Sequence, residues 1–81
     1  MKVRIHVFLK PSVFDPQGNT VGDSLKRMGF SQIKEMRMGK VIDVEMETNL
    51  PEEAKKQVKK MCEKLLVNPV LESYDLEIIK S

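Results

Sequence analysis

The sequence is poor in the residue types on which many functional sites depend. Its 81 residues include one cysteine (Cys62), one histidine (His6) and no tryptophan, and aromatic residues make up only 5%. A single cysteine excludes a disulfide within the chain and a metal site built on a cysteine pair, and it is consistent with a reducing cytoplasm. With so few aromatic side chains, the chain offers little surface for stacking against nucleic-acid bases.

The sequence also lacks long apolar segments and blocks of like charge. No apolar run approaches the length of a membrane-spanning helix, and no charged-then-apolar leader stands at the start. The 14 Lys and Arg residues and the 12 Asp and Glu residues are interspersed and give a formal net charge of +2. Such mixing is weak support for nucleic-acid or membrane binding. We therefore expect a cytoplasmic protein with neither kind of partner.

The length of the chain allows one domain, residues 1–81. A domain of this size buries roughly 60–65% of the surface that its unfolded chain exposes. That is enough for folding but leaves little in reserve, and we therefore expect association into a homodimer or a larger oligomer.

Hydrophobic periodicity predicts six elements in the order β-α-β-β-α-β. Strands are predicted where apolar and polar residues alternate, and helices where apolar residues recur every three to four positions. The predicted elements are a strand at 2–10, a helix at 21–28, two strands within 33–47, a helix within 50–69 and a strand at 73–79. Ile33 is out of phase with Met36 and Met38, which predicts a bulge or a slipped phase in the first strand of the central pair. The simplest packing is an α+β, ferredoxin-like antiparallel sheet with two helices on one face.

The second helix has the clearest boundaries. Pro51 is allowed in the first turn, and the Asn68-Pro69 pair ends the helix because the residue before a proline avoids helical angles. The apolar stripe predicted to face the sheet consists of Ala54, Val58, Met61, Cys62 and Leu65.

No set of residues predicts catalysis, a cofactor site or a metal site. His6 lies on a strand with no cysteine or serine partner at motif spacing, and Cys62 lies on an apolar stripe, where a free cysteine behaves as a small hydrophobe. The acidic row Asp43, Glu45 and Glu47 is consistent with acid–base chemistry or a hard cation, but we favour a solvated strand face. Together with Arg4, His6 and Phe8, this row would form a sheet face open to water or to another subunit.

The stretch Asp15-Pro16-Gln17-Gly18 fits two nearly identical conformations. It matches a type I turn, with Asp, Pro and Gly at their preferred positions, and equally a helix start, with Asp15 as the cap and Pro16 at the first helical position. The residues that follow, from Gly18 to Gly22, are poor helix formers, so packing or outside contacts must hold the first turns. The stretch is therefore a simple joint, an anion site at a helix start or a partner-contact loop.

Four stretches in a fixed order carry the most information about identity. They are DPQG (15–18), LKRMGF (25–30), RMGK (37–40) and LLVNPVLESY (65–74). Together they resemble the PurS family, the small subunit of phosphoribosylformylglycinamidine synthase in purine biosynthesis, and the resemblance covers almost the entire chain. The Gly-Asn-Thr-Val-Gly run after Gln17 departs from the more alanine-rich helix expected of the family.

The resemblance implies a non-catalytic subunit with no cofactor of its own, in a complex that uses ATP, Mg and glutamine. In such a complex a glutaminase subunit releases ammonia, and a large ATP-dependent synthetase subunit uses it to convert formylglycinamide ribonucleotide to the amidine. The small subunit, as a homodimer or tetramer, bridges the two and supports ammonia transfer. Its important residues are then partner contacts, and the candidates are Asp15, Pro16, Gln17, Gly18, Arg37, Gly39, Lys40, Asn68 and Pro69.

Each candidate also has a structural explanation. Gly39 permits a hairpin turn that presents Arg37 and Lys40, while Asn68 and Pro69 fix the exit from the second helix. Two other functions of the same fold stay open: a small ligand-binding regulatory domain and a nucleic-acid-binding module. Retention of a small metabolite through purification would favour the first, and only weak, salt-sensitive, sequence-blind RNA binding would dispose of the second.

Overall fold

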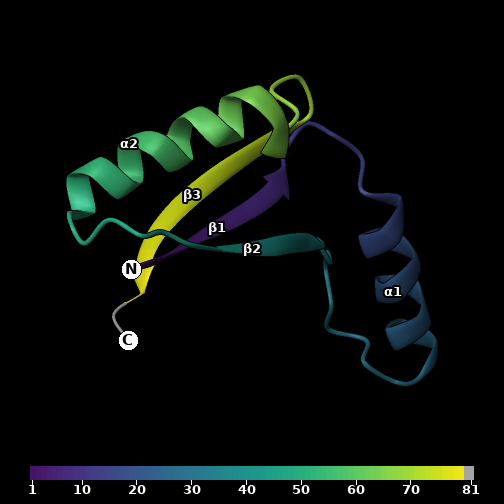
Figure 1. Ribbon diagram of the computed structural model, residues 1–81. Coiled ribbons are helices and arrows are strands. Elements are labelled where there is room, and N and C mark those ends of the chain that lie inside the picture. Colours follow the sequence, from purple (N-terminus) through teal and green to yellow (C-terminus); the bar gives the residue numbers. More distant parts are fainter. Residues whose placement is uncertain (80–81) are drawn as a thin grey trace.

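The computed structural model describes residues 1–79 and shows a three-stranded antiparallel sheet with two helices (Figure 1). Strand β1 (Lys2–Leu9) lies between β2 (Gly39–Glu45) and β3 (Glu72–Ile79), so the strand order is β2-β1-β3. The helices are α1 (Pro16–Arg27) and α2 (Pro51–Met61), and α2 continues into a π-helical turn, η1 (Cys62–Leu66). Within residues 1–79, neither helix has the length and apolar character needed to cross a membrane.

The core lies between α2 and one face of the sheet. The alternation predicted for β1 is confirmed, because Val3, Ile5 and Val7 are buried and their even-numbered neighbours are not. In β2, Ile42 and Val44 are likewise half-buried while Asp43 and Glu45 are exposed, and the middle of β3 alternates in the same way. The buried residues of the core are Val3, Ile5, Val7, Ala54, Val58, Cys62 and Val67. Half-buried side chains of the two outer strands surround them, among them Ile42, Val44, Tyr74, Leu76 and Ile78. The expected α+β class is thus confirmed.

The fourth strand that the sequence predicts is absent. Residues 33–38 form no strand, and they lie against α1 instead of pairing with β2. The backbone N–H of Met38 donates to the carboxylate of Asp15 at 2.7 Å, which satisfies a group that a sheet would otherwise have paired. The apolar residues of this segment do not alternate, so no register could have placed them all on the core face. The ferredoxin-like four-stranded sheet is therefore wrong.

The end of α2 also differs from the prediction. A regular helix would place Leu65 on the core stripe, but its side chain is 84% exposed, whereas Val67 is only 8% exposed. The cause is η1, in which the N–H of Val67 donates to the carbonyl oxygen of Cys62, five residues earlier, at 3.1 Å. A π-helical turn inserts one extra residue per turn. The apolar face consequently passes from Leu65 to Leu66 and Val67.

Helix α1 does not lie on the sheet, contrary to the expectation of two helices on one face. It stands beyond one end of the sheet in Figure 1, and no residue of α1 belongs to the core. Because Phe8 of β1 pairs with Gly39 of β2, residues 10–38 form one long connection between neighbouring strands, which we call the arm. The molecule measures 48 × 30 × 14 Å and its radius of gyration is 16.0 Å. A compact chain of this length has a radius of gyration of about 12 Å.

Candidate functional site

Three connecting segments meet at one end of the sheet, which we call the loop end. They are the outgoing segment of the arm, its returning segment and the loop before β3. Strand β1 ends there at Leu9, and the antiparallel strands β2 and β3 begin there at Gly39 and Glu72. The arm and the loop at residues 67–71 both leave the sheet at this end (Figure 1). The nine candidate contact residues all belong to these segments or to the first residues of β2.

Asp15 caps α1 and at the same time holds the returning end of the arm, at its base. Its side chain is buried, and its two carboxylate oxygens accept hydrogen bonds from the N–H of Gly18 at 2.8 Å and the N–H of Met38 at 2.7 Å. These bonds, with a contribution from the charge of Arg37, lower the pKa of Asp15 below its ordinary value of 3.8. The helix-start interpretation of the Asp15–Gly18 stretch is confirmed. The protein's own carboxylate occupies the place before the Gly18 N–H that a bound anion would take.

The glycines of α1 let the arm close on itself. A Cβ atom on Gly18 would collide with the carbonyl oxygen of Met36, and one on Gly22 would lie 3.1 Å from the Met36 side chain. Both glycines are buried and have ordinary helical angles, because Gly29 is the only residue with positive φ among residues 1–79. The glycine-rich run is thus explained by the close approach of the 33–38 segment.

Lys10 and Arg37 tie the three segments together. Arg37 Nη2 donates to the carbonyl oxygen of Lys10 at 3.0 Å, and Lys10 Nζ donates to the carbonyl oxygen of Pro69 at 2.8 Å. The backbone N–H of Lys10 also donates to the carbonyl oxygen of Leu71 at 2.9 Å. Sequence reasoning missed Lys10, because in the sequence it is only the polar residue at the end of an alternating strand.

Asn68 organises the loop that follows η1. Its Oδ1 accepts a hydrogen bond from the N–H of Val70 at 3.0 Å, and its own N–H donates to Oε1 of Glu72 at 2.8 Å. The first bond is an Asx turn, a local motif in which an Asn side chain replaces a backbone carbonyl. The loop therefore has a fixed conformation from the end of η1 to the start of β3.

The hairpin expected at Gly39 and Lys40 is wrong. Both residues belong to β2, where they pair with Phe8 and Val7 of β1. The turn disappears because the strand expected before it does not form. Gly39 instead allows close approach, since a Cβ atom there would lie 2.8 Å from the carbonyl oxygen of Val7.

The nine candidates differ in how accessible they are. Asp15 and Gly18 are buried. Arg37, Asn68 and Pro69 already take part in hydrogen bonds within the chain. Pro16, Gln17 and Lys40 are exposed, and the side chains of Gln17 and Lys40 form no hydrogen bond to residues 1–79. No partner chain tests these contacts, so all nine stay predictions.

A shallow hollow between arm and sheet brings several candidates together. Gln17 comes from α1 and Lys40 from β2, so residues far apart in the sequence share one surface. The residues that line the hollow are Val7, Phe8, Leu9, Asp15, Gln17, Met38, Gly39, Lys40 and Glu72. Its rim carries charges of both signs next to Phe8, which suits contact with another protein surface.

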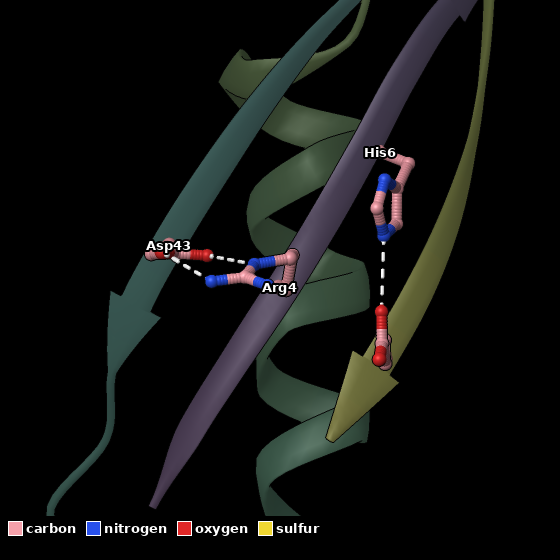
Figure 2. A network of polar contacts seen from close by, with 4 residues as sticks. Arg4, His6 and Asp43 are labelled. Carbon is pink, nitrogen blue, oxygen red and sulfur yellow. Dashed lines mark hydrogen bonds and ion pairs between the residues drawn. The ribbon is translucent and has the colours of Figure 1, made fainter. Parts of the chain in front are cut away.

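The sheet face opposite α2 carries two polar contacts that start from β1, an ion pair at Arg4 and a hydrogen bond at His6 (Figure 2). Arg4 donates to both carboxylate oxygens of Asp43, at 2.9 and 3.2 Å, and this pairing raises the pKa of Arg4 and lowers the pKa of Asp43. On the other side, His6 Nε2 lies 3.1 Å from Oε2 of Glu77. All four side chains are at least one-third exposed. Within residues 1–79 no group of His, Cys, Asp and Glu is arranged to hold a metal ion.

Cys62 has the surroundings of a core residue. It is fully buried, and burial raises the pKa of its thiol. Burial likewise raises the pKa of Tyr74 on β3. A buried thiol with a raised pKa stays protonated at neutral pH, and nucleophilic chemistry requires the thiolate. The interpretation of Cys62 as a small buried hydrophobe is confirmed.

Comparison with known proteins gives one consistent family. Residues 2–80 match the family model PurS, described as phosphoribosylformylglycinamidine (FGAM) synthase. The PurS subunit of Methanocaldococcus jannaschii is 38% identical over 79 residues, which is 98% of this chain and 95% of that protein, and its crystal structure matches with a TM-score of 0.89. Bacillus subtilis PurS matches with a TM-score of 0.85 and 39% identity over 98% of both chains. A chain of PurLQS from Thermotoga maritima matches with a TM-score of 0.85 and 41% identity, over 94% of this chain and 93% of that one.

The α+β fold and the near-full-length matches to these structures identify the class of protein: a small α+β subunit of a ligase complex. The chain belongs to the PurS family, a subunit of FGAM synthase in purine biosynthesis.

Proposed function

We propose that the protein is the non-catalytic small subunit that bridges the glutaminase and synthetase subunits of FGAM synthase and supports ammonia transfer between them. The observation that carries the proposal is the similarity, over more than nine-tenths of both chains, to a chain that was solved as part of PurLQS. By similarity, its partners are the large synthetase subunit, the glutaminase subunit and further copies of this chain.

The shape of the chain supports a role in assembly. The outer edges of β2 and β3 have no strand partner among residues 1–79, and unpaired edges are natural sites of association. The arm exposes large apolar side chains: Phe14 is 69%, Met28 71% and Phe30 56% exposed. Such surface is costly in water and is typical of protein contacts when it is contiguous. A homo-oligomer that meets other subunits would cover it.

The environments of His6 and Cys62 support a role outside the chemical steps. These are the two side chains best suited to catalysis, and one lies beside Glu77 on an exposed sheet face while the other is buried in the core. We therefore propose that the subunit binds no cofactor of its own and that ATP, Mg and glutamine bind to the other subunits. A reduced thiol in the core fits work in the cytoplasm.

The experiment is assembly from purified subunits, followed by size-exclusion chromatography with light scattering. We expect a complex that contains all three subunits and a small subunit that alone is a dimer or larger. A monomer at micromolar concentration, or a failure to join the other two subunits, would contradict the proposal.

Gln17→Ala tests the loop end within this assembly. Gln17 is exposed and its side chain bonds to nothing in residues 1–79, so its loss should leave the Tm of the free subunit almost unchanged while assembly weakens. The control is Gln57→Ala, which removes the same side chain from the exposed face of α2, where it only donates to Glu53 of the same helix at 2.9 Å. Equal assembly by both variants would show that Gln17 is not a contact.

A further inference from the structure

The arm is held to the rest of the molecule by few interactions. It leaves β1 after Leu9 and returns at Gly39, and apart from these two chain crossings α1 has almost no contact with the sheet. Its internal bonds, from Asp15 to Gly18 and Met38, close the arm on itself and do not fix its direction. Something else must set the angle between arm and sheet.

Two cations make the bonds that can set this angle. Arg37, on the returning segment of the arm, donates at 3.0 Å to the carbonyl oxygen of Lys10, the residue directly after β1. The backbone N–H of Lys10 donates to the carbonyl oxygen of Leu71 at 2.9 Å and so keeps Lys10 with the sheet. Lys10, at the other base of the arm, donates through Nζ to the carbonyl oxygen of Pro69 at 2.8 Å, in the loop before β3. The Arg37 side chain is only 33% exposed, so it lies along the protein instead of extending into water. The chain of contacts runs from the arm through Lys10 to the loop that leads into β3.

We propose that Arg37 and Lys10 are positioning residues, which together hold the arm at one angle to the sheet so that both can engage the same partner surface. The inference rests on the proposed function, because it concerns how the subunit joins the complex. Gln17 on the arm and Lys40 on the sheet lie across one hollow, so their spacing depends on this angle. A surface shared by two parts binds more tightly when their arrangement is fixed beforehand, because less freedom is lost on binding.

The variants are Arg37→Ala, Arg37→Lys and Lys10→Met, with Lys34→Ala as the matched control. Lys34 is an exposed cation on the same segment whose side chain forms no bond within residues 1–79. The first readout is the concentration of the subunit that gives half-maximal glutamine-dependent FGAM synthesis with fixed amounts of the other two subunits. The second is amide hydrogen exchange at Val13 and Met38, whose N–H groups are bonded at the base of the arm.

We expect Arg37→Ala and Lys10→Met to raise the half-maximal concentration by roughly threefold to tenfold, the effect of losing one hydrogen bond, with the same maximal rate. Arg37→Lys should give a smaller increase. Exchange at the base of the arm should become faster in Arg37→Ala and stay unchanged in Lys34→Ala. In the double variant Arg37→Ala/Lys10→Met the combined effect should be smaller than the product of the single effects, because the two residues act as one unit.

The outcomes separate this inference from the proposed function. If the unmodified subunit does not stimulate glutamine-dependent synthesis, the proposed function fails, and this inference fails with it. If it does stimulate, but Arg37→Ala behaves as Lys34→Ala does, or the two single effects simply multiply, the positioning role alone is overturned. Faster exchange without a change in half-maximal concentration would also overturn it.

Discussion

The carboxylate of Asp15 accepts a hydrogen bond from the backbone N–H of Met38 across 23 residues of chain, at 2.7 Å. The same carboxylate caps α1 through the N–H of Gly18 at 2.8 Å. One side chain therefore starts the helix of the arm and closes the arm at its base. A capping bond alone would explain only the first of these roles, and the second links Asp15 to the stability of the whole arm.

Asp15→Ala should lower the Tm of the free subunit. Removal of a helix cap has a substantial effect in a small protein, and here the partly buried N–H of Met38 also loses its acceptor. We therefore expect a fall in Tm of roughly 5–10 °C. Thermal unfolding followed by circular dichroism measures it. Asp23→Ala, an exposed carboxylate of the same helix, is the control, and equal Tm values for the two variants would contradict the dual role of Asp15.

The contribution of Asp15 should also depend on pH. Its pKa in the folded chain lies below the ordinary value of 3.8, so below that value the unfolded chain binds the proton first and acid favours unfolding. The contribution of the Asp15 carboxylate to the free energy of unfolding is complete above pH 3.8 and is lost as the pH falls through the pKa of Asp15 in the folded chain. The difference in stability between the unmodified protein and Asp15→Asn should therefore be constant near neutral pH and narrow below about pH 4. Urea unfolding at several pH values measures this, and a constant difference down to about pH 2.5 would contradict it.

The two glycines of α1 should respond differently to alanine. In Gly18→Ala the new methyl group collides with the backbone of Met36, which cannot move without breaking the Met38–Asp15 bond, and we expect a loss on the order of 1–3 kcal/mol. In Gly22→Ala the nearest atoms belong to the flexible Met36 side chain, and alanine's better helix propensity offsets the crowding. Denaturant unfolding should rank Gly18→Ala as much the less stable variant; the reverse order would refute the proposed packing.

The sequence predicts β1, β2, β3 and most of α2 well, because each of these elements is held by a periodic apolar face. Val3, Ile5 and Val7 alternate strictly, and the structure buries all three. The strand predicted before Gly39 does not form. Met36 and Met38 follow a strand-like spacing, but a side chain distant in sequence, Asp15, takes the backbone bond that a strand would have used. A bond of this kind leaves no local pattern in the sequence.

The candidate site could be predicted only in part. The Asp15–Gly18 stretch stands out because cap and turn residues are chemically distinctive. Lys10 does not stand out, since its role depends on two carbonyl groups brought to it by the tertiary fold. Which side of the molecule α1 occupies could not be predicted either, because an arm without a core of its own is placed by few contacts.

The π-helical turn predicts which residue of the helix end matters for stability. Val67→Ala should cost on the order of 1–3 kcal/mol, because its side chain is 8% exposed and fills the core. Leu65→Ala should change stability by no more than about 0.5 kcal/mol, since its side chain is 84% exposed. Urea unfolding of the two variants measures the difference. A larger loss for Leu65→Ala would mean that the helix continues without the extra residue.

The most direct test of the proposed function compares two nitrogen sources in the reconstituted complex. The rate of FGAM synthesis is measured with glutamine and, separately, with an ammonium salt, each with and without this subunit. Because external ammonia bypasses the transfer route, omission of the subunit should abolish most of the glutamine-dependent rate and reduce the ammonia-dependent rate much less. Equal loss of both rates would place the subunit in the synthetase reaction itself, and no loss of either would contradict its role as the bridge for ammonia transfer.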